Sequence, residues 1–476
     1  MLPYAHGETV GLKVIAIDTP SLGDRSYFVH DGQQALVVDP QRDIDRIQTL
    51  AEQEGVSISA VAETHMHNDY VSGGLELARL YGAHYLVSAE DPVRFTRREM
   101  RDGDVVSVGS FGVQALHTPG HTFTHLSFSL LAANGEAQGV FTGGSLLHGS
   151  TGRPDLLGPE HAPTLAGLQH GSAHRLSELL EAKTSIYPTH GFGSFCAATP
   201  TSGTASTIED ERRVNPALLL QREQFIKETL AGLDAFPAYY RHMGPANLAG
   251  PSPVDLTALP AADRASVEHA IASGAWAVDV RPRAQWCSGH IPGSIPFGTD
   301  GSMATYLGWV FPYERQLLLV SDSAQQVAVA QRELVRIGID RPAAAMVAPR
   351  EQLDGRSTRR VTFSEVAAVL SDPGKLVLDV RRNSEREGSH VLGTHHIPLH
   401  ELERRVEEIP PHSEIWVHCA GAYRAAAAVG ILERSGRTAV LIDEPYSAAL
   451  GATGLTIVRG TSDHTPVAPS DKPANP

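Results

Sequence analysis

The most informative stretch of the chain is Thr64-His65-Met66-His67-Asn68-Asp69-Tyr70, which follows the apolar run 58–62 after one residue, Glu63. The apolar run predicts a short strand, and the segment 75–81 predicts a helix soon after it. Side chains at alternate positions of an extended chain point the same way, so His65, His67 and Asp69 can converge on one point. Convergent neutral imidazoles are the ligands that a divalent transition metal needs.

Two further histidines stand at the ends of predicted strands. The strand 113–117 leads into Thr118-Pro119-Gly120-His121, and the short run 185–188 leads into Thr189-His190-Gly191. In this order, the three motifs resemble those of the metallo-β-lactamase superfamily over roughly residues 10 to 200. The resemblance implies a four-layer αββα sandwich with a metal bound at one edge.

Two departures from the family pattern bear on the number of metals. The superfamily continues the first motif with another histidine, where this chain has Tyr70. It also places a metal-bridging aspartate in a turn that reads Phe141-Thr142-Gly143-Gly144 here, so Gly144 stands at that position. Without the bridging carboxylate, two cations are not held close together. A two-metal hydrolase is therefore disfavoured.

A single divalent metal fits the residues that remain. We expect His65, His67 and His121 to be its ligands, with ferrous iron favoured over zinc. The chain resembles the mononuclear iron persulfide dioxygenases most. Those enzymes use two histidine ligands, matched here by His65 and His121, and an aspartate that this chain lacks.

Three other residues of the motifs are candidates for supporting roles. Asp69, Tyr70 and His190 are predicted to orient the ligands or to form a second site. Tyr70 is expected on the open side of the metal, as a hydrogen-bond donor. The opposing interpretation is a decayed site that binds no metal and persists as a scaffold.

The second half of the chain contains an internal repeat. Residues 277–281 and 377–381 nearly match, as do 290–294 and 390–394, so the copies are offset by 100 residues, as from Asp279 to Asp379. Such a repeat indicates two tandem domains. The strand-Asp-x-Arg opening and the His-Ile-Pro-Gly turn resemble rhodanese domains, which are small α/β folds around a parallel sheet.

The second copy carries the stronger catalytic motif. Its buried-strand pattern 414–418 delivers Cys419 to a loop that leads into an Ala-rich helix. Loop amides, the helix N-terminus and Arg424 favour a thiolate, a persulfide or a bound anion. Cys-x4-Arg in this context resembles the rhodanese active-site loop. We therefore predict Cys419 and Arg424 as catalytic residues, and a substrate-binding loop of Ala420, Gly421, Ala422 and Tyr423.

The first copy lacks this chemistry. Ser321 and Gln326 stand where the second copy has its cysteine and arginine. A serine hydroxyl cannot form a persulfide, so we predict that this copy is inactive and serves packing or docking. The roles of Cys196 and Cys287 are open, with simple packing favoured for Cys287.

Length and composition predict the number of domains, the cellular compartment and the classes of partner. A chain of 476 residues predicts about three domains, which we place at 1–245, 252–348 and 356–462, with a linker at 243–253. Three cysteines argue for a reducing compartment. No stretch resembles a signal peptide or a membrane span, and a net charge of −15 disfavours binding to nucleic acid or anionic membranes. We expect a cytoplasmic homo-oligomer.

The predicted function is that of a sulfur-metabolism enzyme. It would combine a persulfide-dioxygenase-like metal module with a rhodanese sulfurtransferase. Its substrates would be a persulfide or thiosulfate, with a small thiol as acceptor. Two alternatives stay open: a zinc-dependent thioester hydrolase of the glyoxalase II type, and a metal-free sulfur carrier or docking protein in which only Cys419 is reactive.

Overall fold

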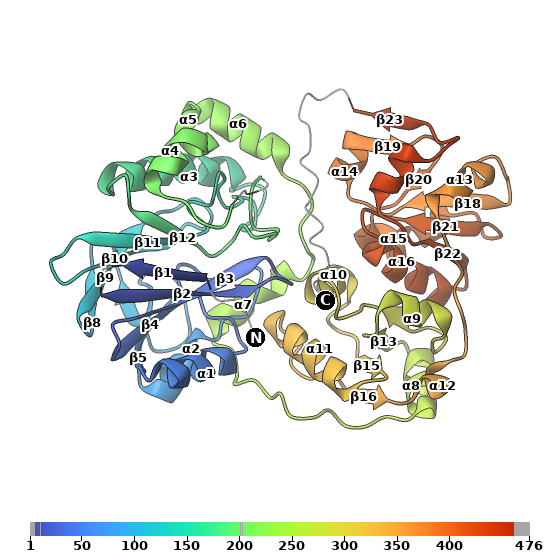
Figure 1. Cartoon of the computed structure of the whole chain (residues 1–476), viewed down its shortest axis with the longest axis horizontal. Coiled ribbons are helices and arrows are strands. Elements are labelled where there is room, and N and C mark those ends of the chain that lie inside the picture. The colour runs from blue at the N-terminus through green and yellow to red at the C-terminus, as the bar shows by residue number, and fades with distance from the viewer. Residues whose placement is uncertain (1–4, 10, 200, 202, 461–476) are drawn as a thin grey trace. The chain divides into compact units, whose positions relative to one another are not determined.

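The structure of the chain is a computed structural model that describes residues 5–9, 11–199, 201 and 203–460 (Figure 1). The chain divides into two compact units. The first comprises the described residues up to Ala258 together with Ser302–Tyr313 and Ala328–Arg341. The second comprises Leu259–Gly301, Glu314–Val327 and the described residues from Pro342. No helix in the described part of the chain has the length and apolar character needed to cross a lipid bilayer.

The first unit contains two sheets. One has seven strands whose spatial order follows the chain: β1 (Ala5–Thr9), β2 (Leu12–Thr19), β3 (Asp24–His30), β4 (Gln34–Val38), β5 (Ser57–Ala62), β6 (His84–Ser88) and β7 (Arg98–Met100). The other has the spatial order β12 (Ser185–Pro188), β11 (Ala137–Gly143), β10 (Leu126–Leu131), β9 (Phe111–His117) and β8 (Val105–Val108). Strands β4 to β7 pair in parallel, as do β11 and β12, and the other neighbours are antiparallel.

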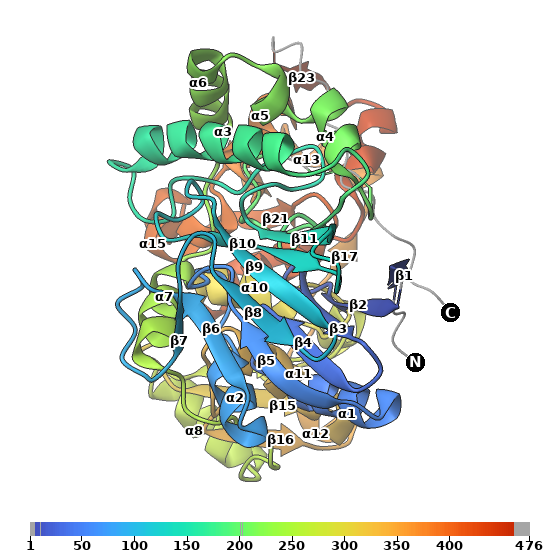
Figure 2. The same cartoon turned by 90° about the vertical axis from the view of Figure 1, so that its left-hand side faces the viewer.

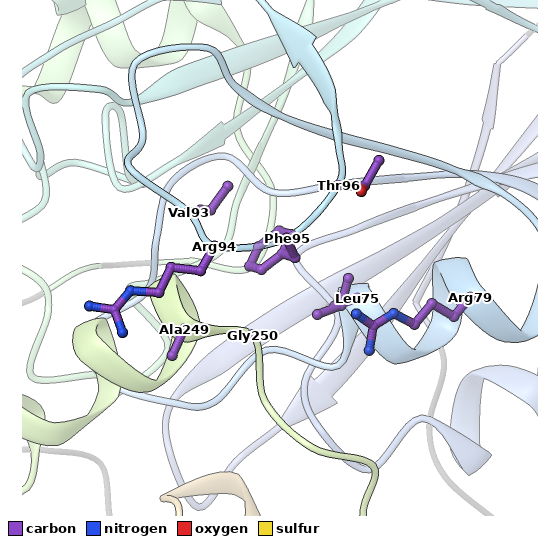
Figure 3. Close-up of a pocket in the computed structure, with 8 residues that line it drawn as sticks. All are labelled: Leu75, Arg79, Val93, Arg94, Phe95, Thr96, Ala249 and Gly250. Carbon is purple, nitrogen blue, oxygen red and sulfur yellow. The ribbon is translucent and has the colours of Figure 1, made fainter.

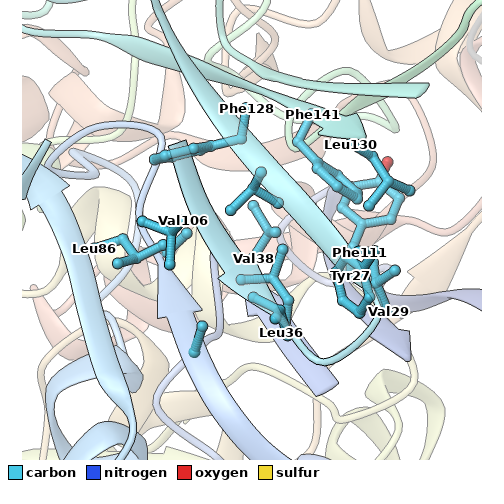
Figure 4. Close-up of a cluster of buried hydrophobic side chains, with 14 of the residues drawn as sticks. Tyr27, Val29, Leu36, Val38, Leu86, Val106, Phe111, Phe128, Leu130 and Phe141 are labelled. Atoms are coloured by element: carbon cyan, nitrogen blue, oxygen red, sulfur yellow. The ribbon is translucent and has the colours of Figure 1, made fainter. Parts of the chain in front are cut away.

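Helices cover the outer faces of both sheets, which gives four layers (Figure 2). Between the sheets, Val29 and Leu36 of the first belong to the same buried cluster as Phe111 and Phe128 of the second (Figure 4). The helices α1 (Asp45–Glu54) and α2 (Gly74–Tyr81) pack on the other face of the first sheet. The second sheet is covered by α3 (Ala162–Leu179), α4 (Ile208–Val214), α5 (Pro216–Leu219) and α6 (Arg222–Gly232). The predicted αββα sandwich is therefore confirmed.

The linker predicted at 243–253 is wrong in its first half, because the helix α7 (Tyr240–Ala249) runs through it. Gly244 and Pro245 are poor residues for a helix interior, which is why the pattern indicated a loop. Packing outweighs this local preference, since Met243 and Asn247 are buried in the first unit.

The first compact unit extends beyond the predicted domain 1–245. It includes α10 (Met303–Val310) and the C-terminal part of α11 (Ala324–Arg336). Within this unit, Arg336 Nη2 donates to the buried Asp43 Oδ2 at 2.7 Å, and the N–H of Val71 donates to the carbonyl of Arg336 at 2.7 Å. The predicted end of the third domain, at 462, lies outside the described residues.

The second unit contains two parallel sheets with a shared strand order. One runs β14 (Ile295–Pro296), β13 (Trp276–Asp279), β15 (Leu317–Ser321) and β16 (Ala344–Val347). The other runs β20 (His395–His396), β18 (Lys375–Asp379), β21 (Glu414–His418), β22 (Thr438–Ile442) and β17 (Arg360–Val361). The short strands β19 (Ser389–Val391) and β23 (Ile457–Arg459) form an antiparallel pair. The helices are α8 (Arg264–Ala272), α9 (Arg283–Ser288), α12 (Arg350–Leu353), α13 (Phe363–Val369), α14 (Asn383–Gly388), α15 (Leu402–Arg405) and α16 (Tyr423–Arg434).

A buried aspartate–arginine pair follows the corresponding strand in both sheets. Arg281 Nη2 donates to Asp279 Oδ2 at 2.6 Å, and Arg381 Nη2 donates to Asp379 Oδ2 at 2.7 Å. Each arginine also donates to a backbone carbonyl eight residues further along the chain. The repeat in the sequence is therefore also a repeat in the structure.

Candidate metal centre and candidate sulfur-transfer site

Three strand ends bring four imidazoles together in the first unit. His65 and His67 follow β5, His121 follows β9, and His190 follows β12. The ring centroid of His65 lies 4.1 Å from that of His67, 4.7 Å from that of His121 and 5.3 Å from that of His190. All four side chains are buried. The three sequence motifs therefore meet at one buried point.

Asp39, which none of the sequence motifs includes, fixes the orientation of His65. Thr64 Oγ1 donates to Asp39 Oδ2 at 2.8 Å, so it accepts from the Nδ1–H of His65 at 2.9 Å. The Nε2 of His65 is then left with its lone pair, and it lies 3.4 Å from His190 Nε2. Burial, and then the neighbouring His67, lower the pKa of His65 well below its ordinary value. This lone pair is therefore available to a metal.

Two glycines leave room for the ring of His121. A Cβ at Gly144 would collide with the ring, and a Cβ at Gly152 would lie 2.7 Å from its Nδ1. Nδ1–H donates to the carbonyl of Arg153 at 2.9 Å, and Nε2 has no hydrogen-bond partner among the described residues. Burial lowers the pKa of His121 to about 3. Gly144 therefore not only stands where the family has an aspartate. Its missing side chain also leaves the space that the ring of His121 occupies.

His190 lies between two buried carboxylates. Its Nδ1 is 2.9 Å from Asp24 Oδ1 and 3.2 Å from Asp69 Oδ2. Burial lowers the pKa of His190, but Asp69 and Asp24 outweigh burial and raise it to about 10. His190 therefore carries a proton on Nε2, which faces His65 Nε2. A divalent cation held by His65 and His190 would take the place of that proton.

His67 forms its hydrogen bonds through Nε2. This atom lies 3.2 Å from Asp39 Oδ1, 3.3 Å from Glu63 Oε2 and 3.0 Å from Tyr70 Oη. Burial lowers the pKa of His67, but Asp39 and Glu63 raise it to about 9. The Nδ1 of His67 is buried and has no hydrogen-bond partner in the described part of the chain.

Tyr70, predicted on the open side of the metal as a hydrogen-bond donor, lies in the interior beside His67. Tyr70 is fully buried, and its ring stacks on that of His67 with the centroids 4.3 Å apart. Its hydroxyl also donates to the carbonyl of Asp39 at 3.3 Å. Tyr70 therefore supports His67 from within the protein.

Three groups of side chains have the geometry to hold a metal ion. They are His65 with His121 and His190, His67 with Asp69 and His190, and Asp39 with Glu63 and His67, and the ligand atoms of each group lie within 4.8 Å of one another. The predicted set of His65, His67 and His121 is not one of these groups, because His190 takes the place expected for His67. Buried nitrogen and carboxylate atoms without partners, including His121 Nε2 and Asp69 Oδ1, suit a divalent cation. The donor set and the fold together support metal binding.

Asn247 in α7 and Tyr239 directly before it hold the loop 67–70 in place. The sequence motifs did not indicate either residue. Asn247 Nδ2 donates to the carbonyls of His67 and Tyr70 at 2.8 and 2.9 Å. Tyr239 Oη donates to the carbonyl of Asp69 at 2.8 Å. Asn247 lies 180 positions from His67 in the sequence, so no local pattern could have indicated this contact.

Cys419 lies between the carboxyl end of β21 and the start of α16 in the second unit. Ala422, at the helix N-cap, has a φ of 67°, a left-handed conformation that costs a non-glycine residue energy. A Cβ at Gly421 would meet nothing within 4 Å. Cys419 is 1% exposed. The thiol therefore sits in a tight turn of small residues directly before a helix, while Cys196 and Cys287 are buried free thiols elsewhere in the chain.

Arg424 forms a two-pronged ion pair with Glu385, which the sequence motifs did not include. Nη1 donates to Oε2 at 2.6 Å, and Nη2 donates to Oε1 at 2.8 Å. Burial raises the pKa of Glu385, but Arg424 outweighs burial and lowers it to about 2. The guanidinium that the sequence assigned to anions is therefore already paired with a carboxylate.

A surface cavity of about 460 Å³ lies elsewhere in the first unit, near α2 and the end of α7 (Figure 3). Its lining includes Leu75, Phe95 and Gly250, together with Arg79 and Arg94. None of the predicted site residues lines it. We therefore assign it no part in the chemistry.

Two family models match the chain, one in each half. The metallo-beta-lactamase superfamily matches residues 24–191, which contain every histidine of the candidate centre. The rhodanese-like domain matches residues 362–449, which contain the Cys419 loop. The chain joins a metallo-beta-lactamase superfamily domain to a C-terminal rhodanese-like domain, and we call it the fusion protein. The fusion confirms the two domain families predicted for the first and last parts of the chain.

Named relatives of the fusion protein cover different shares of its length. The mitochondrial persulfide dioxygenase ETHE1 of Homo sapiens is 29% identical over 249 residues, which are 52% of this chain and 83% of the relative. The lactamase-like protein notP of an Aspergillus species is 30% identical over 211 residues, 42% of this chain and 60% of the relative. A metallo-beta-lactamase structure from Staphylococcus aureus has a TM-score of 0.63 at 26% identity and covers 71% of this chain and 100% of that one. The rhodanese-like domain and the similarity to a persulfide dioxygenase indicate an enzyme of sulfur metabolism with sulfur-containing small-molecule substrates.

Proposed function

We propose that the fusion protein carries out two reactions on sulfane sulfur, persulfide oxidation at the histidine centre and sulfur transfer at Cys419. The observation that carries the proposal is the position of Cys419, at a strand end, in a turn of small residues and before a helix N-terminus. The convergence of buried imidazoles at the first centre supports oxidation, as does the similarity to a persulfide dioxygenase. Thiosulfate or a persulfide would be the sulfur donor, and a small thiol the acceptor.

Sulfur transfer follows from the chemistry of a strand-end thiolate. The Cys419 thiolate attacks the outer sulfur of thiosulfate, the sulfur–sulfur bond breaks, and sulfite leaves with the electron pair. An acceptor thiolate, or cyanide in an assay, then attacks the terminal sulfur of the Cys419 persulfide and releases the thiolate. The N-terminal dipole of α16 favours negative charge on sulfur in both steps. Arg424 and Glu385 hold the loop in place.

The histidine centre would hold one metal through His65, His121 and His190. We favour ferrous iron, which when bound supplies the chemistry that joins dioxygen to persulfide sulfur. Overall, one dioxygen and one water convert a persulfide into sulfite, a thiol and two protons. The chain's own part is to keep His65 and His121 neutral by burial, and to hold His190 through Asp69.

Metal analysis and oxygen uptake with glutathione persulfide test the first reaction. We expect stoichiometric iron, oxygen consumption and sulfite formation by the purified protein. His121→Ala should lose both iron and oxygen uptake, because it removes a nitrogen donor from the centre. His170→Ala, in a half-buried histidine of α3 outside the cluster, is the matched control and should keep both.

The two other functions give different results in the same assays. Zinc in place of iron, with thioester hydrolysis and no oxygen uptake, would establish the hydrolase. A metal-free protein that still transfers sulfur through Cys419 would establish the carrier. The inactivity of the first rhodanese-like copy, the cytoplasmic location and the homo-oligomeric state stay predictions.

A further inference from the structure

Two neighbouring strand ends in the second unit place Asp443 beside Cys419. Strands β21 and β22 are parallel, with Val417 opposite Leu441. Two positions beyond this pair, the chain reaches Cys419 after one strand and Asp443 after the other. Because parallel strands end at the same edge of a sheet, Asp443 stands at the edge that presents the thiol.

Arg283, from α9 in the first copy of the repeat, is bound to this same edge. Its Nε donates to Asp443 Oδ1 at 2.7 Å, and Arg360 Nε occupies Oδ2 at 2.6 Å. The side chain of Asp443 is 5% exposed, whereas that of Arg283 is 35% exposed. Among the described residues, the Nη atoms of Arg283 have no hydrogen-bond partner. The outer half of the guanidinium is therefore available to a ligand.

The electrostatic surroundings of Arg283 favour its charged form. Burial lowers the pKa of Arg283, but Asp443, Asp300 and Cys419 raise it, and the net result lies above the ordinary value for arginine. Arg283 therefore stays fully charged at every working pH.

Arg424, the arginine of the Cys419 loop, differs from Arg283 in how its terminal nitrogens are used. Both terminal nitrogens of Arg424 donate to Glu385, so an anion would have to compete with a carboxylate already in place. Arg283 uses only Nε for its carboxylate. Of these two arginines, Arg283 is the one whose pair of terminal donors is unoccupied by the described residues, and such a pair matches an oxyanion.

A second contact joins the first copy to the Cys419 loop. Tyr423 Oη donates to the carbonyl of Gly298 at 2.7 Å. A Cβ at Gly301 would lie 2.5 Å from the Tyr423 ring, so the backbone there approaches the ring closely. The segment 298–301, which follows β14, therefore lies against the loop that carries the thiol.

We infer that Arg283 binds the anionic group of the sulfur donor at Cys419, so that the copy without a cysteine supplies substrate recognition to the copy that has one. With thiosulfate, this group is the sulfonate end, which leaves as sulfite when Cys419 takes the outer sulfur. Arg283 is thus a specificity-determining residue for anionic donors. The inference rests on the proposed sulfurtransferase reaction.

Sulfur transfer from thiosulfate to cyanide by the full-length protein tests this inference. In Arg283→Gln, we expect the KM for thiosulfate to rise about tenfold or more, the loss typical of a charge-assisted hydrogen bond, with kcat changed less than about threefold. Arg283→Lys keeps the positive charge but loses the paired donors of the guanidinium. Its KM for thiosulfate should lie between those of wild type and Arg283→Gln. Arg360→Gln removes the other partner of Asp443 and is the matched control, with an unchanged KM.

A second donor separates recognition from a structural effect. The persulfide of 2-mercaptoethanol has no sulfonate or carboxylate, so wild type and Arg283→Gln should use it equally well. An unchanged KM for thiosulfate in Arg283→Gln would overturn the inference, as would an equal rise in Arg360→Gln. If wild type transfers no sulfur from either donor, the proposed function itself fails, and Cys419→Ser shows whether the measured transfer depends on this thiol.

Discussion

The two sheets of the second unit share one strand order but differ in the residue at the carboxyl end of the corresponding strand. In the first copy, β15 ends at Ser321, whose buried hydroxyl donates to Gln326 Oε1 at 2.6 Å. In the second copy, β21 delivers Cys419, and Arg424 pairs with Glu385. Apolar strands and a buried aspartate–arginine pair occur in both. The fold thus depends on the strands and the buried pair, whereas the chemistry depends on a few loop residues.

Replacing the residue at the strand end in each copy is expected to give the largest difference. Cys419→Ser should lower sulfur transfer from thiosulfate to cyanide by about a thousandfold or more, because a serine hydroxyl does not form a persulfide. Ser321→Ala should leave the rate within about twofold of wild type, because the bonds of its hydroxyl to described residues go to Gln326 and Ser323 of its own copy. Comparable losses in the two variants would show that the first copy takes part in the chemistry.

The buried pairs should matter equally in the two copies. Asp279→Ala and Asp379→Ala each leave a buried arginine without its carboxylate, so each should lower the free energy of unfolding by about 3–5 kcal/mol. Chemical denaturation measures this, with Glu407→Ala, at a side chain that is 90% exposed, as the control. A large loss of unfolding free energy in only one of the two variants would mean that the pair stabilises one copy and not the other.

Glu385 tests an ion pair that the first copy lacks. The folded state lowers the pKa of Glu385 from its ordinary 4.5 to about 2, so the pair contributes stability above pH 4.5 and loses it as the pH falls toward 2. Glu385→Gln should therefore lower the free energy of unfolding by about 2–3 kcal/mol at pH 7, with the gap to wild type closing below pH 4.5. Gln326→Ala, at the corresponding position of Arg424, should show no such pH dependence. A gap that stays constant down to pH 2 would contradict the ion-pair account.

The smallest expected effect concerns the contact between the copies. Tyr423→Phe removes the hydrogen bond to the carbonyl of Gly298, which should cost about 0.5–1.5 kcal/mol of unfolding free energy. Sulfur transfer should change by less than about threefold, because the ring stays in place. A loss as large as that of Cys419→Ser would assign the hydroxyl a direct part in the reaction.

Several elements could be predicted because their signals are local. The run 58–62 and the strand 113–117 are followed within four positions by His65 and His121, and the structure has β5 and β9 there. The strand-Asp-x-Arg repeat indicated two related sheets with a spacing that the structure keeps. Each of these patterns is a run of residues a few positions apart, so the sequence alone is enough to predict the strand or the repeat.

Other elements were misjudged because packing overrides local preference. Gly244 and Pro245 suggested a linker, yet α7 passes through them since Asn247 binds the loop 67–70. Tyr70 suggested an exposed donor, yet its hydroxyl is bonded to His67 in the interior. In both cases a polar side chain had a buried partner that the local sequence does not reveal.

The order of residues was enough to establish the strands that precede the motifs, the internal repeat and the reactive groups that the chain contains, because each is visible in short runs of the sequence. It was not enough to establish which groups meet. His190 reaches His65 across 125 positions, and Arg283 reaches Asp443 across 160. Buried polar groups must be paired with whatever the folded chain brings near them, and that choice depends on the packing of whole layers.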